Sequence, residues 1–294
     1  MAVLEEFQFE LDNYVFGHRR PIFVDQDGFD PGDDTVLEQD QINPINGSRV
    51  MGRDVPSAGT WTFSMHVDQE DPETALAELA NLAKIWRNGS TGFQTGRTVK
   101  MLRYNLAGRT RVVFGRPRRF SAKPNNRLLG GYLPPLATFD LSDSLHYDDV
   151  ADLVDLVMVP DVSGGFAFPA SFPITFTRDP DAEAPGAITI GGDAATNPVV
   201  TFYGPILNPG LTIGTFKLGL SGSIGEGGSV TVDTRPWAQT ITRAGDTSGV
   251  KLSRDTRLVR ASLRPGTYSA LFRGVDTTGQ SRCRILWRNA WHSL

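Results

Sequence analysis

Three aspartates near the N-terminus carry side chains of the type that binds calcium. Asp25, Asp27 and Asp30 lie in the acidic stretch DQDGFDPGDD. A calcium loop needs carboxylates at a fixed alternating spacing, a glycine at the turn and a distal bidentate glutamate. This stretch lacks both the spacing and the glutamate, so we expect a solvated acidic loop rather than a metal site.

A second acidic group surrounds a histidine. Its potential metal ligands are Asp143, His146, Asp148 and Asp149. The run Ser142–Ser144 is instead typical of a turn, because short polar side chains hydrogen-bond their own backbone. Tyr147 is suited to anchor that turn to a core. We therefore predict that the chain holds no metal and no cofactor.

The hydroxyl and glycine motifs do not complete an enzyme site. Ser221 lies in GLSGS, which differs from the Gly-x-Ser-x-Gly nucleophile elbow and precedes no helix. The GEGGS run at Gly225–Ser229 falls between two expected strands, so we interpret it as a turn rather than a phosphate-binding loop. Paired carboxylates for glycoside hydrolysis stay open at this stage, since such pairs meet only in three dimensions. We predict that the chain is not an enzyme.

Charge is distributed unevenly along a chain whose net charge is only −4. The first forty residues carry eleven acidic residues against two arginines, and residues 97–127 carry ten Lys or Arg and no acid. Arginines bind phosphate well, but acidic residues in the same half favour pairing between copies of the chain. The candidates for such a contact are Arg109, Arg111, Arg116, Arg118, Arg119, Asp27, Asp30, Asp33 and Asp34.

Composition excludes several other classes of protein. The 294 residues are enough for two hydrophobic cores. No stretch approaches the ~20 apolar residues of a membrane-spanning helix, and the acidic N-terminal segment does not match a secretory signal. The single cysteine, Cys283, excludes an intramolecular disulfide and a cysteine-rich zinc site. We expect a soluble protein made in a reducing compartment and not inserted in a membrane.

These side chains must be positioned by a mainly β chain that contains one helix, predicted over residues 72–88. Asp71 is suited to cap it and Pro72 to begin it, and Asn88-Gly89 predicts its end. Its expected apolar stripe consists of Leu76, Leu79, Ala83 and Trp86. We expect this helix to lie against a sheet.

Short alternating runs separated by Gly, Pro, Asn and Asp predict strands elsewhere. Residues 98–114 predict a β-hairpin with a turn at Asn105–Gly108, and Leu153–Val159 predicts a strand covered on both faces. Turn signals after residue 173 have the spacing of a β-sandwich. Pro160–Gly165 reads as a linker, so the predicted domains are residues 1–162 and 163–294.

The order of four C-terminal motifs resembles that of distal tail proteins, also called minor tail or baseplate hub proteins, of phages with long non-contractile tails. These motifs are Ile188–Pro209, Ser229–Trp237, Leu263–Gly274 and Ile285–Leu294. In the first half, GRPRRFS and then Phe139–Asp149, after a strand, helix and hairpin, resemble the same family's belt domain. The resemblance spans nearly the whole chain.

The resemblance implies a fold and a structural role. The fold is an N-terminal β-sandwich or split-barrel belt domain with one α-helix and a long hairpin, followed by a galectin-like β-sandwich. The role is a ring, usually a hexamer, at the distal end of the virion tail, with an open channel through which DNA passes without sequence-specific binding. Implied partners are the tail tube protein, the tape measure protein and a tail-associated hub protein. The resemblance also implies that the protein is made in the host cytoplasm and takes part in host cell entry.

Two other functions stay open at this stage. Galectin-like sandwiches can hold sugars, so the chain could be a carbohydrate-binding adhesion module, with Trp237, Trp287 or Trp291 stacking on a sugar. Core packing and closure of the last strand explain these tryptophans equally well. Hydrolysis of the host cell wall is the other alternative.

Overall fold

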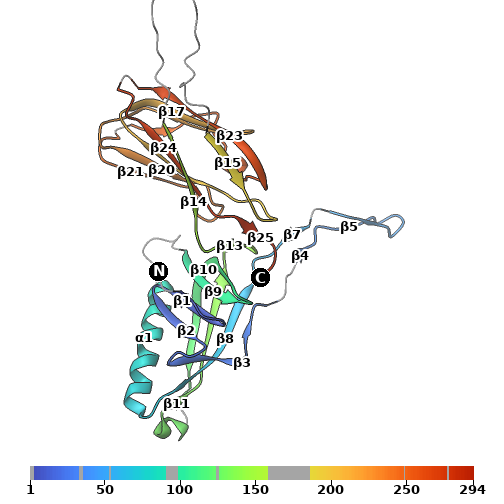
Figure 1. The fold of residues 1–294 in the computed structure, drawn as a ribbon. Helices are drawn as coiled ribbons and strands as arrows, with labels where there is room; N and C mark the ends of the chain where they lie inside the picture. Colours follow the sequence, from blue (N-terminus) through green and yellow to red (C-terminus); the bar gives the residue numbers. More distant parts are fainter. Residues whose placement is uncertain are drawn as a thin grey trace, which may run out of the picture. The chain divides into compact units, whose positions relative to one another are not determined.

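A computed structural model describes residues 3–32, 36–52, 54–90, 99–123, 126–157, 186–247, 249–276 and 278–294. The chain forms two compact units (Figure 1). The first unit comprises Met1–Asp149 together with Trp291–Leu294, and the second comprises Val150–Ala290. Each unit has its own hydrophobic core.

The first unit is built on one large antiparallel sheet. Its strands follow the order β11-β8-β12-β10-β9-β1-β2, with β3 also paired to β8 and β13 lying between β10 and β25. The bounds are β1 (Gln8–Leu11), β2 (Tyr14–Gly17), β3 (Ile22–Asp30), β8 (Thr60–Asp68), β9 (Lys100–Leu106), β10 (Arg109–Ala122), β11 (Tyr132–Leu133), β12 (Pro135–Leu141), β13 (His146–Asp148) and β25 (Ala290–Trp291). Aromatic rings fill the core, because alternate residues of these strands all point to one face. Phe9, Phe16, Phe63 and Phe139 are fully buried there.

Helix α1 (Pro72–Ser90) packs on this core. Its cap is as predicted, since the backbone N–H of Thr74 donates to Asp71 Oδ1 at 2.8 Å. The predicted apolar stripe is partly wrong: the buried side chains are Ala75, Leu82 and Trp86, and Leu76 is exposed. The helix also continues two residues past its predicted end. None of the described helices, α1 and the short η1 (Asn126–Gly130) and η2 (Leu258–Arg260), is long and apolar enough to cross a membrane.

The predicted hairpin is confirmed as β9 and β10. Arg109 pairs with Leu106 across a two-residue turn of Ala107 and Gly108. Both turn residues have positive φ, 52° and 71°, which is the geometry that matches the twist of a tight hairpin. Strand β10 then continues past the hairpin, and a bulge between Pro117 and Phe120 interrupts its pairing with β12.

An arm leaves the first unit between β3 and β8. Four two-residue strands form it, β4 (Val36–Leu37), β5 (Gln41–Ile42), β6 (Arg49–Val50) and β7 (Val55–Pro56). Strand β4 pairs with β7 and β5 pairs with β6, so the segment is one long antiparallel hairpin. In Figure 1 this hairpin reaches away from the sheet that carries it.

The second unit is a β-sandwich of two sheets. One has the order β14-β24-β16-β20-β21, and the other β15-β23-β17-β18-β22 with β19 also paired to β17. The bounds are β14 (Asp152–Val157), β15 (Gly186–Ile190), β16 (Val199–Tyr203), β17 (Ile206–Ile213), β18 (Phe216–Ser221), β19 (Ser223–Ile224), β20 (Ser229–Asp233), β21 (Thr240–Ala244), β22 (Lys251–Leu252), β23 (Gly266–Val275) and β24 (Arg282–Trp287). Inward residues of both sheets, such as Phe202 and Leu218, form the core. The predicted fold class, a mainly β chain with one α-helix and a C-terminal sandwich, is confirmed.

The division between the units differs from the prediction near residue 163. Strand β14 pairs along its length with β24 and so belongs to the second unit, which begins at Val150. It is also an edge strand in which only Leu156 is buried, so the expected cover on both faces is wrong. The predicted linker Pro160–Gly165 lies outside the described residues.

Candidate functional site

Three of the five candidate arginines lie exposed on β10. Arg109 begins the strand, and Arg118 and Arg119 lie at its bulge. Arg118 Nε donates to Asp140 Oδ2 at 2.8 Å, and both side chains keep 40% or more of their exposure. Exposed pairs of this kind contribute only ~0–1 kcal/mol. Arg118 can therefore exchange Asp140 for an acidic group of another molecule at little cost.

Arg111 is instead used inside the first unit. Its side chain is buried, its Nη1 donates to the carbonyl oxygen of Ser293, and its guanidinium lies 4.9 Å from the ring centre of Trp291. An arginine stacked in this way on an indole gains cation–π attraction. Arg111 is thus a residue that fixes the C-terminal segment, which the sequence prediction of an interface role did not anticipate.

Two of the four acidic candidates lie on a strand rather than in a solvated loop. Asp27 and Asp30 are exposed residues of β3, whose register shifts between Val24 and Phe29. The acids fall at this bulge, which explains why the alternation of a strand is hidden in the sequence. Asp33 and Asp34 lie outside the described residues.

Asp25, on the same strand, pairs with a histidine that sequence spacing did not connect to it. Its Oδ1 lies 2.5 Å from Nδ1 of His66 on β8. The imidazole also stacks on Phe23 and Tyr132, at 5.2 and 5.9 Å between ring centres. These contacts hold His66 between neighbouring strands of the sheet.

The group around His146 is divided among separate contacts. Tyr147 donates to Asp143 Oδ2 at 2.6 Å, as the predicted turn anchor requires. His146 Nδ1 pairs with the hydroxyl of Tyr104 at 2.8 Å. Asp148 accepts from Trp291 Nε1 at 2.8 Å. Across the described ranges, no group of three or more His, Cys, Asp or Glu side chains is placed to hold a metal ion.

Asp143 should make the stability of the first unit depend on pH. Burial raises the pKa of its carboxyl to about 6, against opposing hydrogen bonds from Tyr147 and the backbone of Leu145. The folded chain therefore holds this proton more tightly than the unfolded chain, whose aspartates titrate near ~3.9. Stability contributed by this group is present below about pH 4 and lost as the pH rises to about 6.

Asp143→Asn should remove that loss. Urea unfolding at several pH values should show the free energy of unfolding of the unchanged chain falling relative to the variant by roughly 1–2 kcal/mol between about pH 4 and 6. This loss of stability is smaller than the loss expected for a fully buried carboxyl, because the Asp143 side chain keeps partial solvent contact. Parallel pH profiles of the two proteins contradict the raised pKa.

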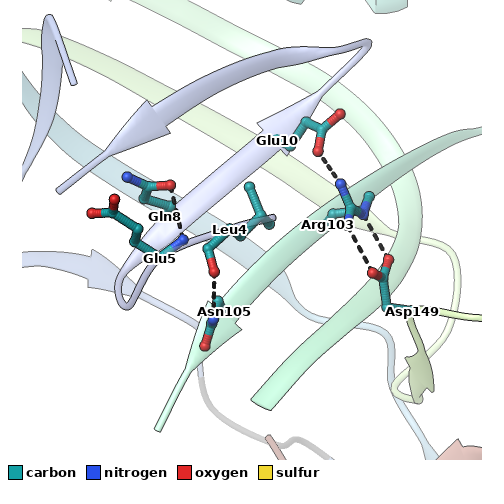
Figure 2. A network of polar contacts seen from close by, with 7 residues as sticks. All are labelled: Leu4, Glu5, Gln8, Glu10, Arg103, Asn105 and Asp149. Carbon is teal, nitrogen blue, oxygen red and sulfur yellow. Dashed lines mark hydrogen bonds and ion pairs between the residues drawn. The ribbon is translucent and has the colours of Figure 1, made fainter. Parts of the chain in front are cut away.

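A buried ion-pair network joins strands β1 and β9 of the first unit to Asp149 (Figure 2). Arg103 on β9 donates to Glu10 on β1, and its Nε and Nη2 donate to the two oxygens of Asp149 at 2.6 and 2.7 Å. The side chains of Arg103 and Glu10 are only 5% and 6% exposed. In the same view, the side-chain amide of Asn105 donates to the carbonyl oxygen of Leu4 at 2.8 Å. The ion pairs of Arg103 tie strand β1 to Asp149, the last residue of the first unit before the second unit begins.

The three candidate sugar-stacking tryptophans lie in different surroundings. Trp287 is buried in the core of the second unit, so it has no free face for a sugar. Trp291 is held by Asp148 and Arg111 in the first unit. Trp237 is half-buried, with the guanidinium of Arg235 5.7 Å from its ring centre. Core packing and closure of the last strand therefore account for two of the three.

The arm is the surface that sequence reasoning missed. Of the seventeen exposed large apolar side chains in the described part of the chain, six lie on it: Leu37, Ile42, Ile45, Val50, Met51 and Val55. Monomeric proteins rarely expose apolar groups at this density, and such surfaces mark contacts with other molecules. The available signal was the run QINPINGS, in which two isoleucines lie among turn-forming residues.

Comparisons with solved structures identify the fold. The chain matches the Dit protein of phage SPP1, described as a paradigm of the hub adsorption apparatus of phages that infect Gram-positive bacteria. The TM-score is 0.53 at 13% identity, over 97% of this chain and 99% of that one. It also matches a chain of the phage P2 baseplate in its activated conformation, in structures with Ca and with Sr. There the TM-score is 0.58 at 12% identity, over 95% and 97%.

No family model and no curated protein matches the sequence. The likeness nevertheless extends over both units and almost the full length of both chains. The resemblance to tail hub proteins, inferred above from the order of sequence motifs, is thus confirmed at the level of the fold.

Proposed function

We propose that this chain is a structural protein of a phage tail tip and forms a ring of its own copies at the distal end of the tail. The observation that carries the proposal is the match in fold to a hub protein and to a baseplate chain, over 97% and 95% of this chain. The apolar arm supports it, because a chain that works alone gains nothing from exposing these side chains to water.

The proposed ring joins the tail tube to the tip proteins and leaves a channel for DNA. A head-to-tail contact repeated around an axis closes into a ring when the rotation closes, and a hexamer is the size we propose. Its partners are then the tail tube protein, the tape measure protein and a tail-associated hub protein. Exposed arginines of β10 contribute to the contact between copies or line the channel without reading base sequence.

The purified chain should form rings. Light scattering should report a mass that rises with concentration to a fixed multiple of 32.1 kDa, and electron micrographs should show closed particles with a central opening. A chain that stays monomeric at every concentration and salt, with no ring in images, contradicts the proposal.

The same assay separates the two roles of the exposed arginines. Replacing Arg109, Arg118 and Arg119 together by Glu should weaken assembly if they contact acids of a neighbour, and high salt should imitate the change. Arg111 is left unchanged because it is buried in the unit. Rings of normal stability from the triple variant assign these arginines to the channel.

Carbohydrate binding by the second unit is the alternative function. Trp237 is the candidate that supports it, since it is only half-buried. A glycan array with the Trp237→Ala variant as control separates sugar binding from a purely structural role. Turnover of purified cell wall tests hydrolysis in the same way.

A further inference from the structure

The outer face of one sheet of the second unit, β15-β23-β17-β18-β22, carries cations and no acids. Alternate residues of a strand point to opposite faces of its sheet. Lys217 on β18, Lys251 on β22 and Arg273 on β23 are all exposed. Each is followed or preceded by a residue of the core, and these core residues are Leu218, Leu252 and Phe272. The three cations therefore point outward, and none of these strands contains an Asp or Glu.

These cations are not neutralised by neighbours. Within the described part of the chain, none of the three side chains forms an ion pair or a hydrogen bond. The same holds for Arg254, which is exposed just after β22. From Val250 to Val275 the chain has six Lys or Arg and one acid, Asp255. Charges of one sign gathered on one face raise its potential and attract molecules of the opposite charge.

Two glycines leave a gap between the cations. Gly210 pairs with Arg273 on one side and with Gly219 on the other. A Cβ atom added at Gly210 would have a backbone oxygen at 3.7 Å as its nearest neighbour, so the surface is open there. Lys217 lies two residues from Gly219 on β18, about 7 Å away, and Lys251 pairs with the residue two positions after Gly219. A ligand can thus approach the backbone with cations around it.

The spread of the cations indicates the shape of the ligand. Arg273 and Lys251 lie on β23 and β22, which are separated by β17 and β18. At a spacing of ~4.8 Å between neighbouring strands, the two positions are roughly 14 Å apart or more. One small anion would touch both only if the two side chains converged across the gap. A chain that bears anionic groups at intervals meets each cation where it lies.

The other outward side chains indicate the class of polyanion. Protein interfaces are centred on aromatic and large apolar anchors, and sites for single-stranded nucleic acid use aromatic rings on which bases stack. The outward positions of these described strands hold no aromatic ring, and the exposed Leu207 and Val275 pair with each other beyond the register shift of β17. Hydroxyl groups lie beside the gap instead, on Thr212, Ser221 and Ser253. This composition favours a phosphate-bearing chain without bases.

We propose that this cationic face, Lys217, Lys251 and Arg273 around the gap at Gly210 and Gly219, binds a phosphodiester polymer of sugar or polyol units. Its phosphates meet the cations, and its backbone crosses the gap. Exposed contacts of this kind are individually weak and screened by salt, so attachment is reversible. The inference goes beyond the proposed ring, because it concerns the second unit alone and does not require copies to assemble.

Titration of the full chain with a glycerol phosphate oligomer of defined length, by calorimetry at several salt concentrations, tests the proposal. The triple variant Lys217→Gln, Lys251→Gln, Arg273→Gln should bind about tenfold more weakly or worse. The slope of log affinity against log salt should fall by about 2–3, because fewer counterions are released. The matched control makes the same change to Gln at three exposed positions of the β22–β23 connection, Arg257, Arg260 and Arg264. Equal losses in both variants contradict a site on the sheet.

Gly210→Val tests the gap without changing the charge. The added side chain has room, and valine is favoured in strands, so urea unfolding should show no loss of stability. It occupies the space that the polymer needs, so the affinity should fall severalfold. Ala187→Val, at an exposed outward position of the edge strand β15, is the control and should bind as the unchanged chain does. Unchanged binding by Gly210→Val overturns the proposed site.

Two other polyanions test the class of ligand. Poly-L-glutamate and single-stranded oligodeoxythymidine, matched in charge to the glycerol phosphate oligomer, should both bind more weakly than it does. Equal or tighter binding of the polypeptide assigns the face to an acidic protein, and the same result with the oligonucleotide assigns it to nucleic acid. Either result overturns the proposal, as does an absence of binding to the oligomer at low salt. Assembly is not measured in this assay, so the proposed ring is tested separately.

Discussion

Arg103→Ala is expected to lower the free energy of unfolding of the first unit by about 3–5 kcal/mol, because it leaves a buried charge without its partner. Glu10, 6% exposed, then faces the protein interior with no cation beside it. Asp149 loses a bidentate contact at 2.6 and 2.7 Å. Amide hydrogen exchange of the full chain, measured across a urea series, reports the stability of β1 and β9 separately from that of the second unit.

Arg118→Ala is the matched control for that change. It removes an arginine–aspartate contact of similar length, 2.8 Å, whose side chains are 52% and 40% exposed, and should cost about 1 kcal/mol or less. Adding Glu10→Met to Arg103→Met should recover part of the loss, since an apolar pair needs no compensating charge. Equal effects of Arg103→Ala and Arg118→Ala contradict a structural role for the network.

Trp86→Ala should destabilise the same unit by about 3–5 kcal/mol through the cavity it leaves under α1. The indole contacts the rings of Phe16, Phe63 and Phe139 at 6.0 to 6.4 Å between centres. Its Nε1 also donates to the carbonyl oxygen of Thr138 at 3.1 Å. Urea unfolding should show a lower midpoint with a similar slope.

Leu76→Ala, on the same helix, should change stability by no more than about 0.5 kcal/mol. Leu76 is 45% exposed, whereas Trp86 is fully buried. A large loss of stability in Leu76→Ala supports the apolar stripe expected from the sequence and contradicts the orientation of α1 described above.

Local signals were enough to find the helix and the hairpin but not to orient the helix. The cap of α1 at Asp71 and its start at Pro72 depend only on residues close by in the chain, so they can be predicted from the sequence. The buried line through Ala75, Leu82 and Trp86 is set by the sheet beneath it. Leu76 and Leu82 are equally apolar, and only the tertiary contact decides between them.

Long-range contacts account for other features that the sequence did not reveal. Arg103 lies 93 residues from Glu10 and 46 from Asp149, so no spacing rule connects them. The apolar residues of β14 can be read from the sequence, but its pairing with β24 cannot. The predicted division was therefore placed near residue 163 and not at Val150. Strand β17 contains Asn208-Pro-Gly, a turn signal that the structure accommodates as a register shift between Leu207 and Gly210.

The return of Trp291–Leu294 to the first unit determines the order in which the protein can be made. The second unit, Val150–Ala290, is an insertion within the first, so the ribosome completes it before Trp291 emerges. Until then Arg111 and Asp148 lack the indole that they hold in the finished fold. Domains fold as units during synthesis, so the arm-bearing unit is the last to mature.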